Sequence, residues 1–305
     1  MEQHKKAFLF LHLSVFLFGF TAILGDIIDL NFPSIVWWRS LMTSMILVFM
    51  VKISTFLKVF SLKTIAKHTF IGFILAIHWL FFYGSIKISN PTMALIALSS
   101  SALITALLEP LLIRKAKFRL VDVILGILVI PGFIMIFYNS DQLQQKGLWI
   151  GIGAAILGAI FSILNKKWLV TGQELKMTYI QLTSVVITIS LFFLIFSGIF
   201  DLKYQIPHGI DWFYMFVFAL FCTVIAYYLY LKAFNHISAF DVSLAFNMEP
   251  IYGIIMAALL LKDYREVSAM VYLGMLFIIS LVFLDTYVKF RKNKFKNEPD
   301  SIDII

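Results

Sequence analysis

The residues of this chain with the greatest chemical potential lie inside long apolar segments. Glu249 and Pro250 stand in the run Asn247-Met248-Glu249-Pro250-Ile251-Tyr252-Gly253. A carboxylate at membrane depth is costly unless it faces a partner or a water-filled cavity, and a proline frees a backbone carbonyl that must be satisfied locally. The run therefore indicates a cavity lining in which Glu249 binds a cationic group or takes up a proton, with Asn247 and Tyr252 as further candidates. The alternative is structural: Glu249 bonds backbone groups freed by Pro250.

Two basic side chains in earlier apolar segments could act with this carboxylate. Arg39 has the planar fork that suits a substrate carboxylate, or it could pair with Glu249; alternatively, it reaches out to the membrane surface. His78, beside Trp79, titrates in the physiological range and is the second candidate for proton coupling. The alternative for His78 is a neutral ring that hydrogen-bonds a neighbouring helix.

The remaining candidates carry weaker signals. His12 has the same two interpretations as His78. Tyr227, in a polar stripe with Thr223 and Tyr230, suits either substrate contact or interfacial anchoring. Asn165 could reach a cavity, whereas the lysines that follow it are explained by anchoring at the inner membrane surface. The six histidines and the single cysteine show no metal-ligand spacing, so we expect no metal site and no cofactor.

The composition requires that these side chains be positioned by membrane helices. Apolar residues make up 61% of the 305 residues, charged residues 14%, and the mean hydropathy is +0.93. A soluble domain would be about a quarter charged. The net charge of +8 does not indicate nucleic-acid binding, because the basic residues flank apolar segments or lie in the C-terminal tail. The lone Cys222 excludes a disulfide framework within the chain.

Ten apolar segments are long enough to cross a bilayer, which needs about 20 residues per helix. We expect spans at 7–25, 34–52, 68–86, 91–113, 119–138, 147–165, 178–198, 211–232, 238–261 and 268–289. Pro250 and Pro131 are the predicted hinges, since an internal proline removes a helix hydrogen bond and kinks the helix.

The positive charges predict the orientation of these spans. With the N-terminus inside, 19 of the 25 Lys and Arg residues fall in inner segments, 5 in outer loops, and Arg39 within a span. This bias predicts a multi-pass protein of the cell (inner) membrane with both termini in the cytoplasm.

The two halves of the chain echo each other. Phe18-Gly19-Phe20 aligns with Leu157-Gly158-Ala159, and Ile88-Ser89 aligns with Ile237-Ser238. Each half holds five expected spans, so the second half would insert upside down, as in the inverted repeats of secondary transporters. We therefore predict an all-α membrane protein with two inverted five-helix repeats, 1–140 and 141–290, around a central cavity, and a cytoplasmic tail at 291–305.

In this arrangement the chain resembles the drug/metabolite transporter superfamily, and within it the EamA-type permeases. The residues that carry the resemblance are, in order, Phe18-Gly19-Phe20, Trp37-Trp38-Arg39-Ser40, Ala76-Ile77-His78-Trp79, Phe82 to Asn90, Glu109-Pro110, Leu164-Asn165-Lys166-Lys167 and Asn247-Met248-Glu249-Pro250. The resemblance implies a basket of helices that exports or exchanges small metabolites by alternating access. One departure is Ser101, which stands where many members have a proline, so we expect a softer break there than at Pro250.

The predicted function is secondary transport of a small metabolite, with export of amino acids or similar zwitterions as the favoured case and proton coupling as an option. A lipid-headgroup flippase is the main alternative. An intramembrane enzyme is less favoured, because the sequence has no nucleophile, zinc or phosphate-loop motif, and we name no catalytic residue. The expected partners are the substrate and the lipid bilayer, with the chain as a monomer or homodimer and with no nucleic acid.

Overall fold

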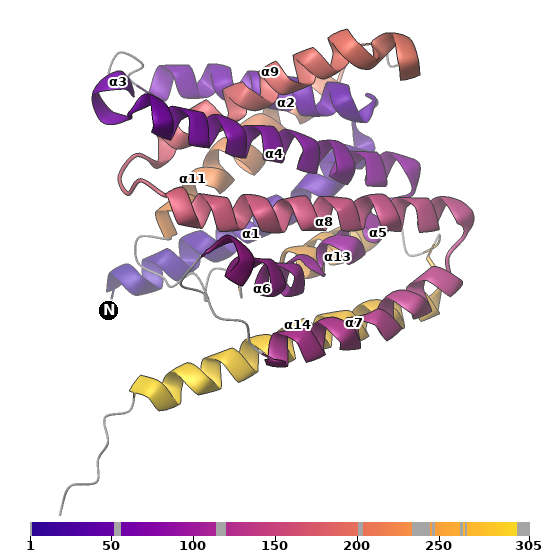
Figure 1. The fold of residues 1–305 in the computed structure, drawn as a ribbon. Helices are drawn as coiled ribbons and strands as arrows, with labels where there is room; N and C mark the ends of the chain where they lie inside the picture. The colour runs from indigo at the N-terminus through magenta and orange to yellow at the C-terminus, as the bar shows by residue number, and fades with distance from the viewer. Residues whose placement is uncertain are drawn as a thin grey trace, which may run out of the picture.

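The computed structural model of the chain is all-helical over the residues that the structure describes. These residues are 2–51, 56–113, 120–200, 204–233, 245, 248–262, 265 and 267–297. The helices pack into a single bundle in which most run roughly parallel or antiparallel to one another (Figure 1). This agrees with the all-α part of the predicted fold class, since no strand occurs in the described ranges.

The first half of the chain follows the expected spans closely. Its elements are α1 (Glu2–Ile27), α2 (Phe32–Met50), α3 (Phe56–Val59), α4 (Leu62–Ile88), α5 (Pro91–Leu98), α6 (Ser101–Leu112) and α7 (Leu120–Tyr138). Asparagine caps begin two of these helices: Asn31 accepts the N–H of Ser34 at 3.0 Å, and Asn90 accepts the N–H of Met93 at 2.9 Å. A proline in the first turn of each helix strengthens these starts.

The second half contains the corresponding helices. They are α8 (Gln142–Trp168), α9 (Glu174–Phe200), α10 (Asp211–Ala219), the π-helical segment η2 (Leu220–Ile225), α11 (Ala226–Ala233), α13 (Glu249–Leu260) and α14 (Ala269–Asn297). The eighth expected span thus consists of α10, η2 and α11 in direct succession, and the π-helical η2 forms a widened turn at its centre. Such π-helical insertions are frequent at functional sites.

The helix contacts keep the same pattern when the two halves are exchanged. The first span, α1, packs on η2, α11 and α13, whereas the sixth span, α8, packs on α4, α5 and α6. The second span packs on the seventh (α2 on α9), and the fifth packs on the tenth (α7 on α14). The most extensive contacts among the described residues all join a helix of one half to a helix of the other.

The fourth span is broken at its serines. The axes of 91–98 and 103–112 differ by 46°. The hydroxyls of Ser99 and Ser100 donate to the carbonyls of Ile96 and Ala97, at 2.6 and 2.7 Å. Hydroxyls that bond the preceding turn compete with the helix ladder and bend it. The first half therefore has a pronounced break without a proline.

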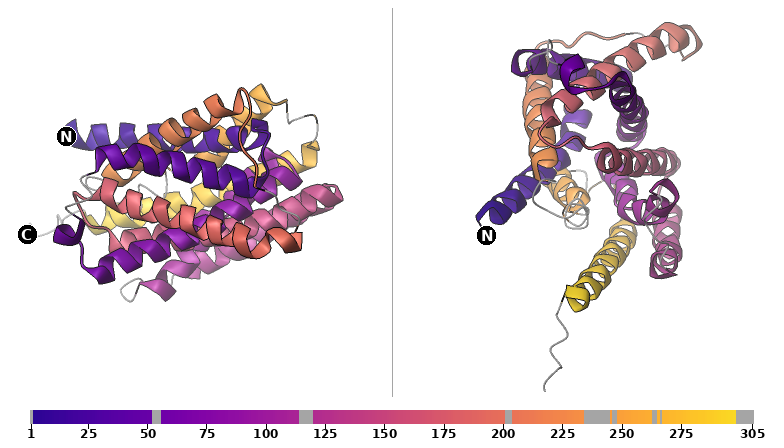
Figure 2. Two further views of the ribbon diagram at one scale, coloured as in Figure 1. Left: turned by 90° about the horizontal axis from the view of Figure 1, so that it is seen from above. Right: turned by 60° about the vertical axis from the view of Figure 1, so that its left-hand side comes forward.

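Six helices of the described residues are long and apolar enough to cross a membrane, and the bent pair of α5 and α6 makes seven if it is one span. The described apolar parts of α13 and α14 are shorter than a span. The chain is therefore a multi-pass membrane protein, while the expected number of ten spans exceeds what these helices establish. The N-terminus and the last residues of α14 lie at the same end of the bundle (Figure 2).

Candidate functional site

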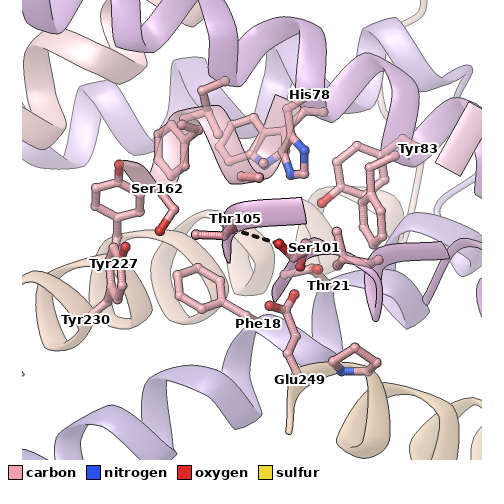
Figure 3. Close-up of a pocket in the computed structure, with 18 of the residues that line it drawn as sticks. Phe18, Thr21, His78, Tyr83, Ser101, Thr105, Ser162, Tyr227, Tyr230 and Glu249 are labelled. Carbon is pink, nitrogen blue, oxygen red and sulfur yellow. Dashed lines mark hydrogen bonds between the residues drawn. The ribbon is translucent and has the colours of Figure 1, made fainter. Parts of the chain in front are cut away.

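A cavity of about 150 Å³ lies between the two halves of the bundle. Its polar and charged lining residues are Thr21, Arg39, His78, Ser101, Thr105, Ser162, Tyr227, Tyr230 and Glu249. The apolar and aromatic part of the lining includes Phe18, Trp79, Phe82, Tyr83, Phe161 and Pro250. Figure 3 shows Tyr227, Tyr230 and Ser162 together at one end of the cavity and Tyr83 at the other. The lining comes from both halves, as expected for a site between two repeats.

Arg39 is anchored on three sides. It is 1% exposed, so it does not reach the membrane surface as one interpretation of the sequence had it. Its Nε donates to Thr223 Oγ1 at 2.7 Å, Nη1 donates to the Tyr83 hydroxyl, and Nη2 donates to the Cys222 carbonyl at 3.1 Å. Two of the guanidinium's five N–H groups remain without a partner among the described residues. They can bind an anionic group that enters the cavity.

The widened turn of η2 supplies two of these anchors. Thr223 donates its hydroxyl to the carbonyl of Phe218 at 3.0 Å, five residues back, and so leaves its oxygen free to accept from Arg39. Cys222 contributes its backbone carbonyl rather than its thiol. The π-helical segment therefore serves as the seat of the buried guanidinium.

His78 is held against α8. Its Nδ1 donates to the carbonyl of Ala154 at 2.8 Å, and its ring stacks on Phe82 with centroids 6.3 Å apart. A Cβ on Gly158 would lie 3.1 Å from the His78 ring, so this glycine makes room for the imidazole. With Nδ1 bonded in this way, His78 remains part of the cavity lining.

Glu249 is the first residue of α13. A carboxylate is stabilised at this position by the partial positive charge of the helix N-terminus. The Glu249 side chain points towards Ser101 in Figure 3. Close packing behind it sets this position: a Cβ on Gly19 would lie 3.1 Å from the Gly253 nitrogen and 3.2 Å from the Glu249 carbonyl. Although Glu249 and Arg39 both line the cavity, no direct ion pair joins them in the described structure.

Five of the nine predicted binding or coupling residues line this cavity: Glu249, His78, Arg39, Trp79 and Tyr227. Tyr252 packs edge-on against Phe16 instead, with ring centroids 6.0 Å apart. His12 is exposed on the surface of α1. Of the two predicted hinges, Pro250 lines the cavity, whereas Pro131 lies inside α7, which continues through it as one helix. Asn165 is buried beyond Tyr227, and Asn247 lies outside the described residues.

Several cavity residues escaped the sequence analysis. Tyr83 and Thr21 are the clearest, since both line the cavity and Tyr83 accepts a hydrogen bond from Arg39. Tyr83 lies one helical turn after Trp79, so the shared face of α4 was a usable signal. Thr21 carried no such signal, because single threonines occur in many of the apolar segments. Within the described residues, no group of three or more His, Cys, Asp or Glu side chains could hold a metal ion.

Two repeats of membrane helices around a partly polar cavity define a membrane transporter of small molecules. Comparison of the sequence with protein-family models identifies the family. The model of the EamA-like transporter family matches twice, at residues 5–138 and 145–285. The chain belongs to this family, and the two matches coincide with the two halves described above. No curated protein matches the sequence.

Solved structures support the fold alone. One crystal structure, described only as "Crystal structure of protein", aligns with a TM-score of 0.61 at 12% sequence identity. The alignment covers 93% of this chain and 98% of that one. The arrangement of helices is therefore shared along nearly the whole length, while the low identity gives no information about the substrate.

Proposed function

We propose that the protein is a secondary transporter that moves a small zwitterionic metabolite, such as an amino acid, by alternating access. One observation carries this proposal: Arg39 and Glu249 line the same cavity with opposite charges and form no direct ion pair. Two N–H groups of Arg39 have no partner among the described residues, and a carboxylate such as Glu249 at membrane depth is costly unless it gains a partner. A substrate with a carboxylate and an ammonium group would supply a partner to each.

The rest of the lining supports a small substrate with an apolar part. Phe18, Phe82 and Phe161 offer aromatic surface, while Ser101 and Thr105 add hydroxyl groups. A few placed polar groups on a largely apolar wall are typical of small-molecule sites. A cavity of about 150 Å³ suits a metabolite of amino-acid size better than a lipid headgroup with its acyl chains.

The two halves suggest how the cavity is exposed to each side in turn. Ten spans in two inverted repeats, as the sequence predicts, would allow one set of helices to rock against the other around the central site. One end of the bundle, called here the lysine-rich end, carries Lys63 and Lys67 at the start of α4 and Lys166 and Lys167 at the end of α8. This end is the proposed cytoplasmic side of an inner membrane, and export is the proposed direction. Glu249, with His78 as second candidate, is the proposed site of proton coupling.

An export screen followed by reconstitution tests the proposal. Metabolites that accumulate in the medium of cells overproducing the chain, relative to cells without it, identify the substrate. In proteoliposomes, Glu249→Gln should then reduce exchange of that substrate at least about tenfold without changing the melting temperature. Glu109→Gln is the matched control, because Glu109 pairs with Lys166 outside the cavity.

Three outcomes decide between the parts of the proposal. Normal exchange by Glu249→Gln across pH would make this carboxylate structural. Accumulation of phospholipid-derived compounds rather than free metabolites would favour the flippase. For proton coupling, an imposed pH gradient should by itself drive uptake; absence of uptake would leave a uniporter or exchanger.

A further inference from the structure

Beyond Tyr227, a buried polar network joins four helices. The Tyr227 hydroxyl donates to Gln181 Oε1 at 2.6 Å. The amide nitrogen of Gln181 contacts Asn165 Oδ1 at 2.9 Å and His68 Nδ1 at 3.1 Å. All four side chains are at most 3% exposed, and they come from α11, α9, α8 and α4. The sequence analysis singled out Asn165 and Tyr227 but not the residues that connect them.

The chemistry of the amide fixes the direction of these bonds. A glutamine side chain has two N–H donors and one carbonyl acceptor. In Gln181 both donors are used, by Asn165 and His68, and the carbonyl accepts from Tyr227. His68 Nδ1 is therefore an acceptor, and the Tyr227 proton points away from the cavity. Every polar group of Gln181 is satisfied in this arrangement.

The network lies between the cavity and the lysine-rich end of the bundle. His68 precedes the cavity residue His78 by ten positions on α4, which is about 15 Å along a helix. Asn165 follows the cavity residue Ser162 by one turn of α8 and directly precedes Lys166 and Lys167. Figure 3 shows Tyr227 beside Ser162 at one end of the cavity.

On one side of the network, α4 and α9 are locked together. A Cβ on Gly72 would lie only 2.2 Å from the backbone carbonyl oxygen of Gln181, so the two helix backbones are in contact at this glycine. Ser184 donates to the carbonyl of Thr69 at 2.8 Å, one turn further along α9. His68 and Gln181 thus lie on two helices that approach closely at Gly72 and are joined by the hydrogen bond of Ser184.

On the other side, α11 is attached to α1. Ser14 donates to the Ala226 carbonyl at 2.8 Å, and Phe18 packs edge-on against Tyr230 with centroids 6.3 Å apart. The segment that precedes α11 is η2, whose π-helical turn lacks the regular helix ladder. The hydrogen bond of Tyr227 therefore connects the α1–α11 pair to the α4–α9 pair. The irregular backbone of η2 is where we expect α11 to change its angle.

We propose that the Tyr227–Gln181 hydrogen bond is a latch that closes the cavity towards the lysine-rich, cytoplasmic end. Breaking it would free α11 to pivot at η2 with α1 and open the cavity on that side. Tyr230, which lies with Ser162 of α8 at this end of the cavity, would move away in the same step. The latch rests on the proposed alternating-access function, but its test needs no substrate.

Cysteine accessibility provides that test. In a Cys222→Ser background, which removes the only cysteine, Ser101→Cys places a small reporter on the cavity wall. Its reaction with a membrane-impermeant maleimide is timed in sealed inside-out and right-side-out vesicles. Tyr227→Phe and Gln181→Met each remove the latch while keeping side-chain volume. Tyr228→Phe makes the same change one residue away, where the hydroxyl accepts from Lys232.

The expected result is a rise of about five- to tenfold in the labelling rate from the cytoplasmic face for both latch variants, the shift expected on loss of one buried hydrogen bond. The double variant should not exceed Gln181→Met, since Gln181→Met already removes the bond to Tyr227 together with the two bonds that Gln181 donates to Asn165 and His68. Tyr228→Phe should label like the parent.

Unchanged labelling in both latch variants, or a rise from the opposite face, would overturn the latch. A melting temperature matching the parent establishes that each variant is folded; if Gln181→Met is unstable, Tyr227→Phe alone decides. The Glu249→Gln transport assay can fail while this test succeeds, so the two proposals are separable.

Discussion

The guanidinium of Arg39 lies over the face of the Trp79 ring, 4.0 Å from its centre. Phe218 offers a second ring at 4.3 Å, so the cation is sandwiched between aromatic faces from α4 and α10. Such contacts gain strength when the cation is removed from water. They explain how a positive charge is accommodated at membrane depth without a carboxylate in contact.

Arg39→Lys tests whether this geometry matters beyond the charge. Lysine keeps the positive charge but lacks the planar fork that stacks on Trp79 and bonds Thr223 and Cys222 together. We expect a lower melting temperature and at least about a tenfold weaker affinity for an anionic substrate group. Thermal unfolding in detergent and transport kinetics would measure both. A variant with the parent's affinity would mean that Arg39 only holds the helices together.

Gly19→Ala tests the close crossing of α1 and α13 behind Glu249. The new methyl group would meet the backbone of Gly253 and Glu249, which cannot move aside as a side chain can. We expect destabilisation by about 1–3 kcal/mol, the usual range for overpacking, together with slower transport. Gly84→Ala is the matched control, since its nearest neighbours would lie 3.8 Å or more away. Equal stability of the two variants would contradict the crossing.

His78→Phe separates the two interpretations of this histidine. Phenylalanine can preserve the stacking on Phe82 but cannot donate to the Ala154 carbonyl. If the role is structural, unfolding should become easier by about 1 kcal/mol, and transport should keep its response to a pH gradient. Loss of that response in a folded variant would instead give His78 a part in proton coupling. Uptake driven by an imposed pH gradient is the measurement.

Glu109→Gln should have little effect, in contrast to Glu249→Gln. Glu109 pairs with Lys166, and both side chains are partly exposed, 29% and 40%. Solvent-exposed ion pairs contribute about 0–1 kcal/mol, so the melting temperature and the transport rate should stay near those of the parent. A large loss of transport here would show that α6 and α8 must stay joined at this point during the cycle.

The fold could be predicted from the sequence to the extent that it depends on apolar segment length. The spans around Arg39, His78 and Tyr227 lie where the hydropathy placed them, because helices of about 20 apolar residues satisfy their own backbone in a membrane. The break after Leu98 was expected to be softer than the one at Pro250, because Ser101 replaces a proline; since 246 and 247 lie outside the described residues, that comparison stays a prediction. Side-chain bonds of Ser99 and Ser100, which no apolar pattern reveals, make the break after Leu98 pronounced.

The candidate site was predicted in part because charges within apolar segments are rare. Glu249, Arg39 and His78 stand out for that reason, and the structure brings all three to one cavity. Gln181 and Thr21 did not stand out, since uncharged polar residues are common in membrane helices. Their roles depend on which helices become neighbours, and α9 meets α4 at Gly72 only in the folded bundle.

The pairing of α7 with α14 has a consequence for how the protein is made. Gly132 and Gly274 meet at this crossing, where a Cβ on Gly274 would lie 2.9 Å from the Gly132 carbonyl. The two glycines are 142 residues apart in sequence, 274 minus 132. At translation rates of about 5–20 residues per second, roughly 7–30 s pass between the synthesis of Gly132 in α7 and that of Gly274 in α14. During that interval the glycine face of α7 is open to lipid or to any other nascent helix, so α14 of the second repeat completes the packing of the first.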